Sequence, residues 1–383
     1  MTWHLISLTI ASELQRETPM ATCIIHIGMH KTGSTSIQHS LDGFQDERFS
    51  FASLGNSPNH SYAVYDLFTR DGERGFFDAA PQAQVIEAHE RQLRQAIADT
   101  GQRDLIISGE QISSMHPNAI KRLHDFLATH FETLRVVSYV RPPASYLASA
   151  FQQRLKKRNP TFEPLRLYRS YRDTFGKFDE IFGAEQVTLW KFEPSILHNR
   201  CAVSDFCQRL AIALPSARIR TENESLSRQL VGLLYVYRKY APQLAESLQI
   251  EEVEALNRRL LTTWSDRFAL SPELTQAIHQ HFAEDIGWME DRLGQSLQEQ
   301  PRSTPYAVNS EADLIHTAGE TLEELCDLIG QPRPQAPHQL APEAAAQLFH
   351  QLRSPGGEPQ TPPPRSSRNR LTNAAQRLLK RLS

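Results

Sequence analysis

Residues 22–36 read TCIIHIGMHKTGSTS and carry the clearest structural signal in the chain. The apolar, β-branched run over residues 22–27 is typical of a buried parallel strand, and Gly28 ends it. A turn rich in glycine, serine and threonine follows, and a helical pattern begins at Ser36. In a loop between a strand and a helix, backbone N–H groups and the helix dipole converge on one point. We therefore expect this loop to bind an anion, with phosphate as its natural ligand.

The loop departs from the nucleotide-triphosphatase pattern G-x-x-x-x-G-K-[ST]. Gly28 and Gly33 have the spacing of the two glycines, but Ser34 stands where the lysine belongs. The lysine lies instead at Lys31, from where its ammonium group can still reach a phosphate oxygen. Loops of this composition also occur as plain turns, so a second segment is needed to support an anion site.

Three more apolar runs resemble strands and are separated by helical patterns. They cover residues 104–110, 134–140 and 186–192, and a helix is expected around residues 118–130. This alternation predicts an α/β fold of the three-layer, P-loop type, with a mostly parallel central sheet flanked by helices. Arg141 ends one of these strands at the edge where open α/β sheets bind ligands, and Ser149 follows in the next helix. A guanidinium and a hydroxyl at this place predict a second phosphate site.

The pairing of residues 30–35 with the motif Arg141-Pro142-Pro143…Ser149 resembles the sulfotransferases that use 3′-phosphoadenosine 5′-phosphosulfate (PAPS), especially bacterial and carbohydrate-type members. The resemblance covers roughly residues 21 to 295. It implies that the 5′ end of PAPS is held by Lys31, Thr32, Gly33, Ser34, Thr35 and Ser36, and the 3′-phosphate by Arg141 and Ser149. Ser36 stands where many cytosolic members have an aromatic residue, and the late R-K-G segment of that branch is absent. The serine argues against that branch, and the missing segment leaves part of the 3′-phosphate site unassigned.

The resemblance also implies a reaction. A sulfuryl group would pass from PAPS to a hydroxyl or amine of a carbohydrate or other small-molecule acceptor, with no metal required. Lys31 would neutralise the bridging oxygen of the leaving phosphate. Glu110 is our first candidate for the general base because it follows a strand at the sheet edge, although it can also cap the next helix. His60 is the second candidate because a histidine titrates near neutrality.

Two other classes of function stay open. A P-loop kinase using ATP is disfavoured by the displaced lysine and by the lack of an acidic residue for Mg²⁺, Glu110 excepted. A non-catalytic nucleotide-binding protein is disfavoured by Lys31 and Glu110 together, since a pure binder needs no base. Arg154, Lys156, Lys157 and Arg158 form a basic cluster, which we interpret either as an anionic-acceptor site or as a solvated helix end.

Composition limits the remaining choices. The 383 residues suggest two to three units at about 150 residues each, or one large α/β domain with appendages. A net charge of −3 argues against a nucleic-acid partner, and no apolar run is long enough to span a membrane. Four scattered cysteines suggest neither a zinc cage nor a disulfide framework, so we expect a reducing, cytoplasmic location.

We divide the chain into five segments. We expect residues 1–19 to be a disordered leader or a mis-called start, and residues 20–300 to form the sulfotransferase-like domain. Residues 301–330 are interpreted as a peripheral helical extension, and the proline-rich residues 331–365 as a disordered linker. Residues 366–383 form a basic amphipathic tail that could contact a membrane or an acidic partner, or be a solvated end. The oligomeric state is not predicted.

Overall fold

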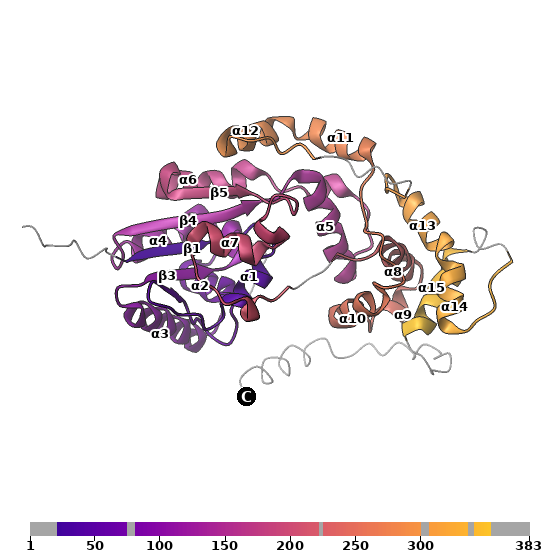
Figure 1. Ribbon diagram of the computed structural model, residues 1–383, viewed down its shortest axis with the longest axis horizontal. Coiled ribbons are helices and arrows are strands. Elements are labelled where there is room, and N and C mark those ends of the chain that lie inside the picture. Colours follow the sequence, from indigo (N-terminus) through magenta and orange to yellow (C-terminus); the bar gives the residue numbers. More distant parts are fainter. Residues whose placement is uncertain (1–20, 75–80, 222–224, 300–305, 336–340, 354–383) are drawn as a thin grey trace, which may run out of the picture. The chain divides into compact units, whose positions relative to one another are not determined.

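The computed structural model describes residues 21–74, 81–221, 225–299, 306–335 and 341–353 (Figure 1). The described residues fall into two compact units. The first takes residues up to 154, 161–228 and 265–313, and the second takes residues 155–160, 229–264 and those from 314 onward. The expected leader (1–19) and basic tail (366–383) lie outside the described residues.

The first unit is built on a parallel sheet of five strands in the order β2-β3-β1-β4-β5. The strands are β1 (Thr22–His26), β2 (Phe49–Phe51), β3 (Asp104–Ser108), β4 (Thr133–Val140) and β5 (Val187–Lys191). The predicted α/β fold with a parallel central sheet flanked by helices is therefore confirmed. The short strand β2 was not predicted, and it pairs with β3 at the edge of the sheet.

Helices flank this sheet along the chain (Figure 1). The helices of the first unit are α1 (Ser34–Leu41), α2 (Ser61–Phe68), α3 (Ala83–Thr100), α4 (Pro117–Leu127), α5 (Pro143–Lys156), α6 (Lys177–Phe182), α7 (Ala202–Leu210), α11 (Pro272–His281) and α12 (Ala283–Leu293). Helices α1 and α7 pack on each other. With alternate residues of the strands, including Ile24, Ile106 and Val137, they form one buried hydrophobic cluster.

The strand order shows where the sheet reverses its direction of growth. From β1 the chain moves toward β2 at one end of the sheet, whereas from β4 it moves toward β5 at the other end. Because β1 and β4 are neighbours, their carboxyl ends lie where the strand order reverses. Ligands of open α/β sheets bind at this point. The two segments that the sequence singled out, after Ile27 and after Val140, therefore begin side by side.

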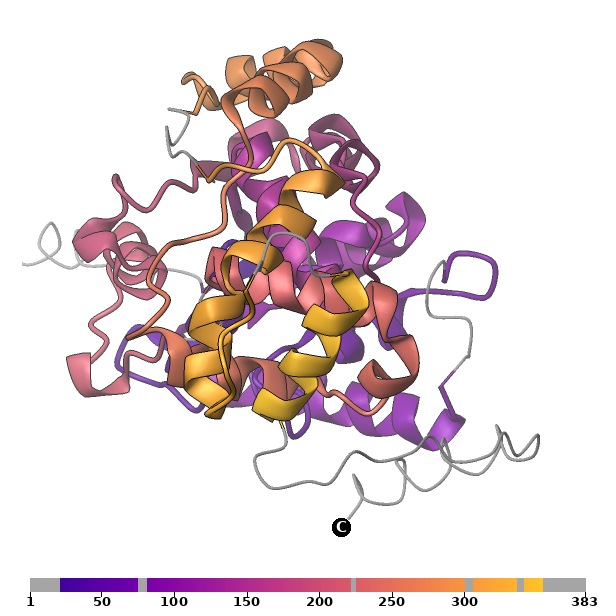
Figure 2. The same ribbon diagram turned by 90° about the vertical axis from the view of Figure 1, so that its right-hand side faces the viewer.

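The second unit is helical. It contains most of α8 (Arg228–Tyr240) and of α13 (Glu311–Glu320), together with α9 (Pro242–Ala245), α10 (Ile250–Leu260), α14 (Leu322–Ile329) and α15 (Pro342–Arg353). An apolar stripe along α8 is buried, as Leu230, Leu233 and Leu234 show. Gly232 allows close packing, since a Cβ there would lie 2.9 Å from the backbone N of Ala318. Helices α14 and α15 pack against each other, and Figure 2 shows them at the orange and yellow end of the colour scale.

Helix α15 corrects one prediction. Residues 331–365 were expected to form a disordered linker because of their prolines, but Pro342–Arg353 is a helix that buries Ala345, Ala346, Phe349 and Leu352. Proline at the first position of a helix lacks only an N–H that would be unsatisfied there, so Pro342 starts this helix rather than preventing it.

Two further properties follow from the described residues. No helix among them is both long and apolar enough to cross a membrane. All four cysteines are free thiols, and Cys23, Cys207 and Cys326 are buried.

Candidate functional site

The loop after β1 has the backbone shape of an anion cradle. Gly28, Lys31 and Gly33 all have positive φ, at 49°, 69° and 82°. The Thr32 hydroxyl donates a hydrogen bond to the Met29 carbonyl at 2.5 Å and closes the turn. Because this side chain is fully buried and used inside the loop, only the backbone N–H of Thr32 is suited to the ligand contact that the resemblance implied.

Ser34 is the most informative side chain in the loop. It opens α1, is 3% exposed, and its Oγ has no hydrogen-bond partner among the described residues. A Cβ at Gly28 would lie 2.7 Å from this oxygen, so glycine leaves room beside it. A buried hydroxyl without a partner is costly unless a ligand completes its hydrogen bonding. This observation fits a phosphate or sulfate group in the loop.

The first turn of α1 supplies the rest of the cradle. Gly33 precedes the helix in the left-handed conformation, and a Cβ there would lie 2.7 Å from Cβ of Ala202 in α7. Thr35 is half-buried and Ser36 is buried in the same turn. Since the first N–H groups of a helix have no partner within the helix, they add donors and positive potential to the loop.

Arg141 joins the two predicted segments. Its Nη1 donates to the Lys31 carbonyl at 2.5 Å, and its backbone N–H lies 3.4 Å from Met29 Sδ. Its guanidinium also contacts the ring of Phe192, 5.5 Å from the centroid. The structure therefore brings together the loop and the arginine that the sequence paired.

Ser149 lies one helical turn beyond Ser145, which is the serine that contacts Arg141. Arg141 Nε donates to Ser145 Oγ at 3.3 Å, whereas Ser149 is half-buried and makes no hydrogen bond among the described residues. Tyr146 stands near Arg141 and Arg169, and burial raises the pKa of its phenol while the two guanidinium groups lower it. Ser145 and Tyr146 were missed by the sequence reasoning, although they lie on the same helix turns as Ser149.

Glu110 lies next to the loop, as predicted. It opens a 3-10 turn (Glu110–Ser114) after β3, and its Cβ lies 3.3 Å from where a Cβ of Gly28 would be. The side chain is half-buried. A carboxylate beside the anion cradle is well placed to take a proton from an acceptor.

His60 does not lie at the site as expected. It is fully buried, its Nδ1 accepts a hydrogen bond from the Ser108 N–H at 3.0 Å, and its ring packs on Phe51 with centroids 4.8 Å apart. Burial lowers the pKa of its imidazole to about 4. A core histidine of this kind supports β3 rather than exchanging protons with a substrate. Its neighbour Ser61 reaches the sheet edge instead, where its Oγ accepts from the Gln111 N–H.

Three residues far from the loop in sequence contact it. Arg169 Nη1 donates to His30 Nδ1 at 2.7 Å, and Gln111 lies 3.1 Å from the other ring nitrogen of His30. Lys31 Nζ donates to Gln153 Oε1 on α5 at 3.3 Å. No local pattern marks Arg169, Gln111 or Gln153, so sequence reasoning could not have found them. Together they hold the side chains of His30 and Lys31 beside the cradle.

Positive charge gathers around this edge of the sheet. Lys177, at the start of α6, donates to the Met115 carbonyl at 2.9 Å. Burial, and to a smaller extent the charge of Arg169, lower the pKa of its ammonium group to about 8. Lys31, Arg141, Arg169 and Lys177 therefore set a local positive field in a chain of net charge −3.

The comparisons with known proteins add little to this geometry. No protein-family model matches the chain, and no curated protein sequence matches it. Among solved structures, a sulfotransferase from Alicyclobacillus acidocaldarius is similar, with a TM-score of 0.35 and 14% identity. The match covers 71% of this chain and 96% of that one. The chemistry of the site must therefore be inferred from its own residues.

In the part of the chain that the structure describes, no group of three or more histidine, cysteine, aspartate or glutamate side chains is arranged to hold a metal ion. What the site offers is a cradle of N–H groups, a hydroxyl without a partner, several cations and one adjacent carboxylate.

Proposed function

We propose that this protein is a PAPS-dependent sulfotransferase that acts on a hydroxyl or amine of a carbohydrate or other small-molecule acceptor. The observation that carries the proposal is the buried Ser34 hydroxyl without a partner, in a loop whose Lys31 carbonyl is bonded to Arg141. A single phosphate cradle tied to a second cationic site suits a nucleotide with separated phosphates better than a triphosphate. The displaced lysine of the loop supports the same choice.

Each residue has a role in this proposal. The loop N–H groups and Ser34 hold the 5′ end of the donor, and Arg141 with Ser149 holds its 3′-phosphate. When bound, the donor supplies an activated sulfuryl group. Lys31 places its ammonium group where negative charge develops on the leaving phosphate, and Gln153 orients it. Glu110 accepts the proton of the acceptor hydroxyl.

Donor identity is tested by calorimetry in EDTA with adenosine 3′,5′-bisphosphate and with ATP. We expect the wild type to bind the bisphosphate more tightly, and Arg141→Ala to lose this preference. Arg166→Ala, an exposed arginine of the same unit, is the matched control and should bind like the wild type. A preference for ATP, or binding of neither nucleotide, would rule out the proposal in favour of a kinase or a non-catalytic binder.

The catalytic roles are tested by turnover with PAPS. General bases contribute about 100- to 10,000-fold, so Glu110→Gln should lower kcat in this range while bisphosphate binding is kept. Lys31→Ala should lower kcat as well. Glu132→Gln, an exposed carboxylate on the same unit, should leave kcat unchanged. If neither Lys31→Ala nor Glu110→Gln lowered turnover, the mechanism would be wrong.

A further inference from the structure

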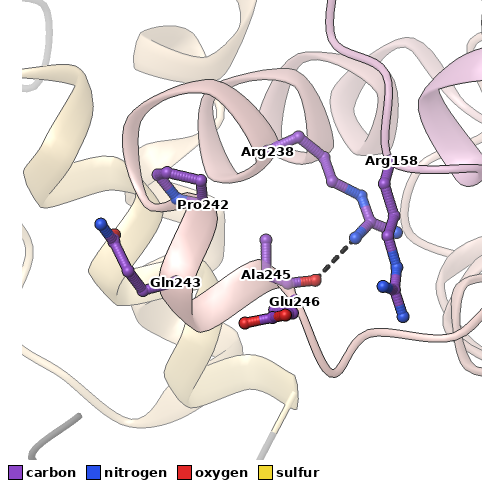
Figure 3. Close-up of a pocket in the computed structure, with 6 residues that line it drawn as sticks. All are labelled: Arg158, Arg238, Pro242, Gln243, Ala245 and Glu246. Carbon is purple, nitrogen blue, oxygen red and sulfur yellow. Dashed lines mark hydrogen bonds between the residues drawn. The ribbon is translucent and has the colours of Figure 1, made fainter. Parts of the chain in front are cut away.

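The second unit contains a cavity of about 330 Å³ that the proposed function does not use. Its lining residues are Arg158, Arg238, Pro242, Gln243, Ala245 and Glu246 (Figure 3). Figure 3 shows the guanidinium groups of Arg158 and Arg238 next to each other on one side of this cavity. Two like charges at one cavity wall call for an explanation.

Arg238 is a buried cation without a counter-ion. It is 4% exposed, and its guanidinium donates to the carbonyls of Ala245, Lys156 and Leu248 at 2.6, 3.0 and 3.2 Å. Its Nε is buried with no acceptor, and no carboxylate pairs with it among the described residues. Carbonyl dipoles hold the group rigidly but leave its net charge uncompensated, which is costly in a low-dielectric interior.

Arg158 brings a second positive charge to the same place. It follows the end of α5 with a φ of 77°, a conformation that non-glycine residues rarely adopt. Its side chain is exposed and forms no ion pair in the described part of the second unit. Burial, and to a smaller extent the charge of Arg158, lower the pKa of Arg238 to about 10.

The neighbouring carboxylates supply little of the missing negative charge. Glu252 raises the pKa of Arg238, but its carboxylate is ion-paired with Arg353. Lys156 is buried and pairs with Glu254 at 3.2 Å, so the basic cluster 154–158 does not act as one surface patch. Glu246 lines the cavity but is exposed, and the structure records no ion pair between its carboxylate and either arginine. Among the residues of the basic cluster 154–158, only Arg158 lines the cavity, next to the buried Arg238.

We propose that this cavity binds a tetrahedral oxyanion, a phosphate or sulfate group, through the paired guanidinium groups of Arg158 and Arg238. Arg158 presents its N–H donors in a planar fork that matches two oxygens of such a group, and Arg238 adds a fixed positive charge beside it. Arg238 forms the fixed wall of the site, and the exposed Arg158 closes on the ligand. The cavity has room for the small molecule that carries the group as an ester. The site lies within the second unit and does not depend on the proposed sulfotransferase activity.

The test uses the full chain and a readout local to the site. Phenylglyoxal modifies accessible arginines, and peptide mass spectrometry reports the modification rate of Arg158 separately from that of the exposed Arg166 in the first unit. We expect inorganic phosphate, at constant ionic strength, to slow modification of Arg158 and leave Arg166 unchanged. A second arm uses glucose 6-phosphate. Protection at a lower concentration than inorganic phosphate would assign the site to an ester, and equal protection would assign it to the free ion.

Two single variants distinguish loss of phosphate binding from loss of folding. Arg158→Ala keeps a non-glycine residue at the same φ, and Lys157→Ala removes an exposed neighbouring charge as the matched control. Arg158→Ala removes the residue that phenylglyoxal modifies, so phosphate binding to the variants is measured by calorimetry on the full chain. Binding should weaken at least about tenfold in Arg158→Ala and persist in Lys157→Ala. Glu246→Gln should tighten it, because a nearby negative charge is removed. Equal modification of Arg158 with and without both anions would overturn the proposal.

Discussion

Gly33 is the residue at which the loop, α1 and α7 meet. A Cβ there would lie 2.7 Å from Ala202 Cβ at a φ of 82°. We expect Gly33→Ala to lower the free energy of unfolding by about 2–4 kcal/mol, from left-handed strain and overpacking together. Urea unfolding would measure the loss.

The double variant Gly33→Ala/Ala202→Gly separates the two causes. The double variant removes the clash between the two Cβ atoms but keeps the left-handed strain at residue 33. After correction for the cost of Ala202→Gly alone, its free energy of unfolding should exceed that of Gly33→Ala by the part due to overpacking. No recovery would mean that the close approach of these two residues does not matter for stability.

His60 makes stability depend on pH. Burial holds the pKa of its imidazole at about 4, below the unfolded value of 6.5. The unfolded chain therefore takes up a proton first as the pH falls. The stabilisation is fully present above pH 6.5 and is lost as the pH falls toward 4. At pH 5 we therefore expect the free energy of unfolding to be about 2 kcal/mol lower than at pH 7.5 because of His60.

Urea unfolding of wild type and His60→Gln at the two pH values isolates this effect. The wild type should lose about 2 kcal/mol more than the variant between pH 7.5 and pH 5. His26, which burial also holds at a pKa of about 4, contributes equally to both proteins and cancels in the difference. Identical pH profiles would show that His60 is not held neutral by burial.

Single residues also show where sequence reasoning succeeds. The loop after β1 and Arg141 were paired from local patterns, a glycine spacing after an apolar run and an arginine at a strand end. The structure brings them together, since Arg141 donates to the Lys31 carbonyl. His60 was misplaced because its local sequence is polar, while its burial comes from Phe51 and from the Ser108 amide on β3. Arg169 was missed because its partner His30 lies 139 residues away.

Helix α15 was not predicted from the sequence. Its Phe349 is fully buried and packs edge-on against Tyr237, with ring centroids 5.2 Å apart. Phe349→Ala should lower the free energy of unfolding by about 3–5 kcal/mol. Gln347→Ala, an exposed position of the same helix, should change it by less than about 0.5 kcal/mol. A Phe349→Ala variant as stable as Gln347→Ala would mean that α15 is not part of the second unit's core.

The four longer strands of the sheet were predicted, whereas the shortest strand and helix α15 were not. Strands β1, β3, β4 and β5 each have five or more residues and lie in apolar-rich segments bounded by turn signals. Strand β2 has three residues, too few for an alternating pattern. Helix α15 was hidden because prolines on both sides of it suggested a linker, although residues 344–353 have few residues that disfavour a helix.

At the scale of the whole chain, every residue proposed to hold the donor lies in the first unit, at the edge where β1 and β4 meet. Bound phosphate oxygens accept hydrogen bonds from loop N–H groups, which removes these groups from solvent and slows their exchange. Adenosine 3′,5′-bisphosphate should therefore slow amide exchange over residues 28–36 and 141–150. Exchange in α10 and α15 of the second unit should be unchanged.

Hydrogen-exchange mass spectrometry of the full chain, with and without the bisphosphate, checks this prediction. Arg141→Ala should remove the protection in both segments, because its guanidinium bonds the loop at the Lys31 carbonyl and is also the proposed 3′-phosphate ligand. Ser34→Ala should reduce it mainly over residues 28–36, since the lost hydroxyl lies in that loop alone. Protection of α15 equal to that of the loop would contradict a donor site confined to the first unit. The nucleotide would then act on stability as a whole rather than on the cradle after β1.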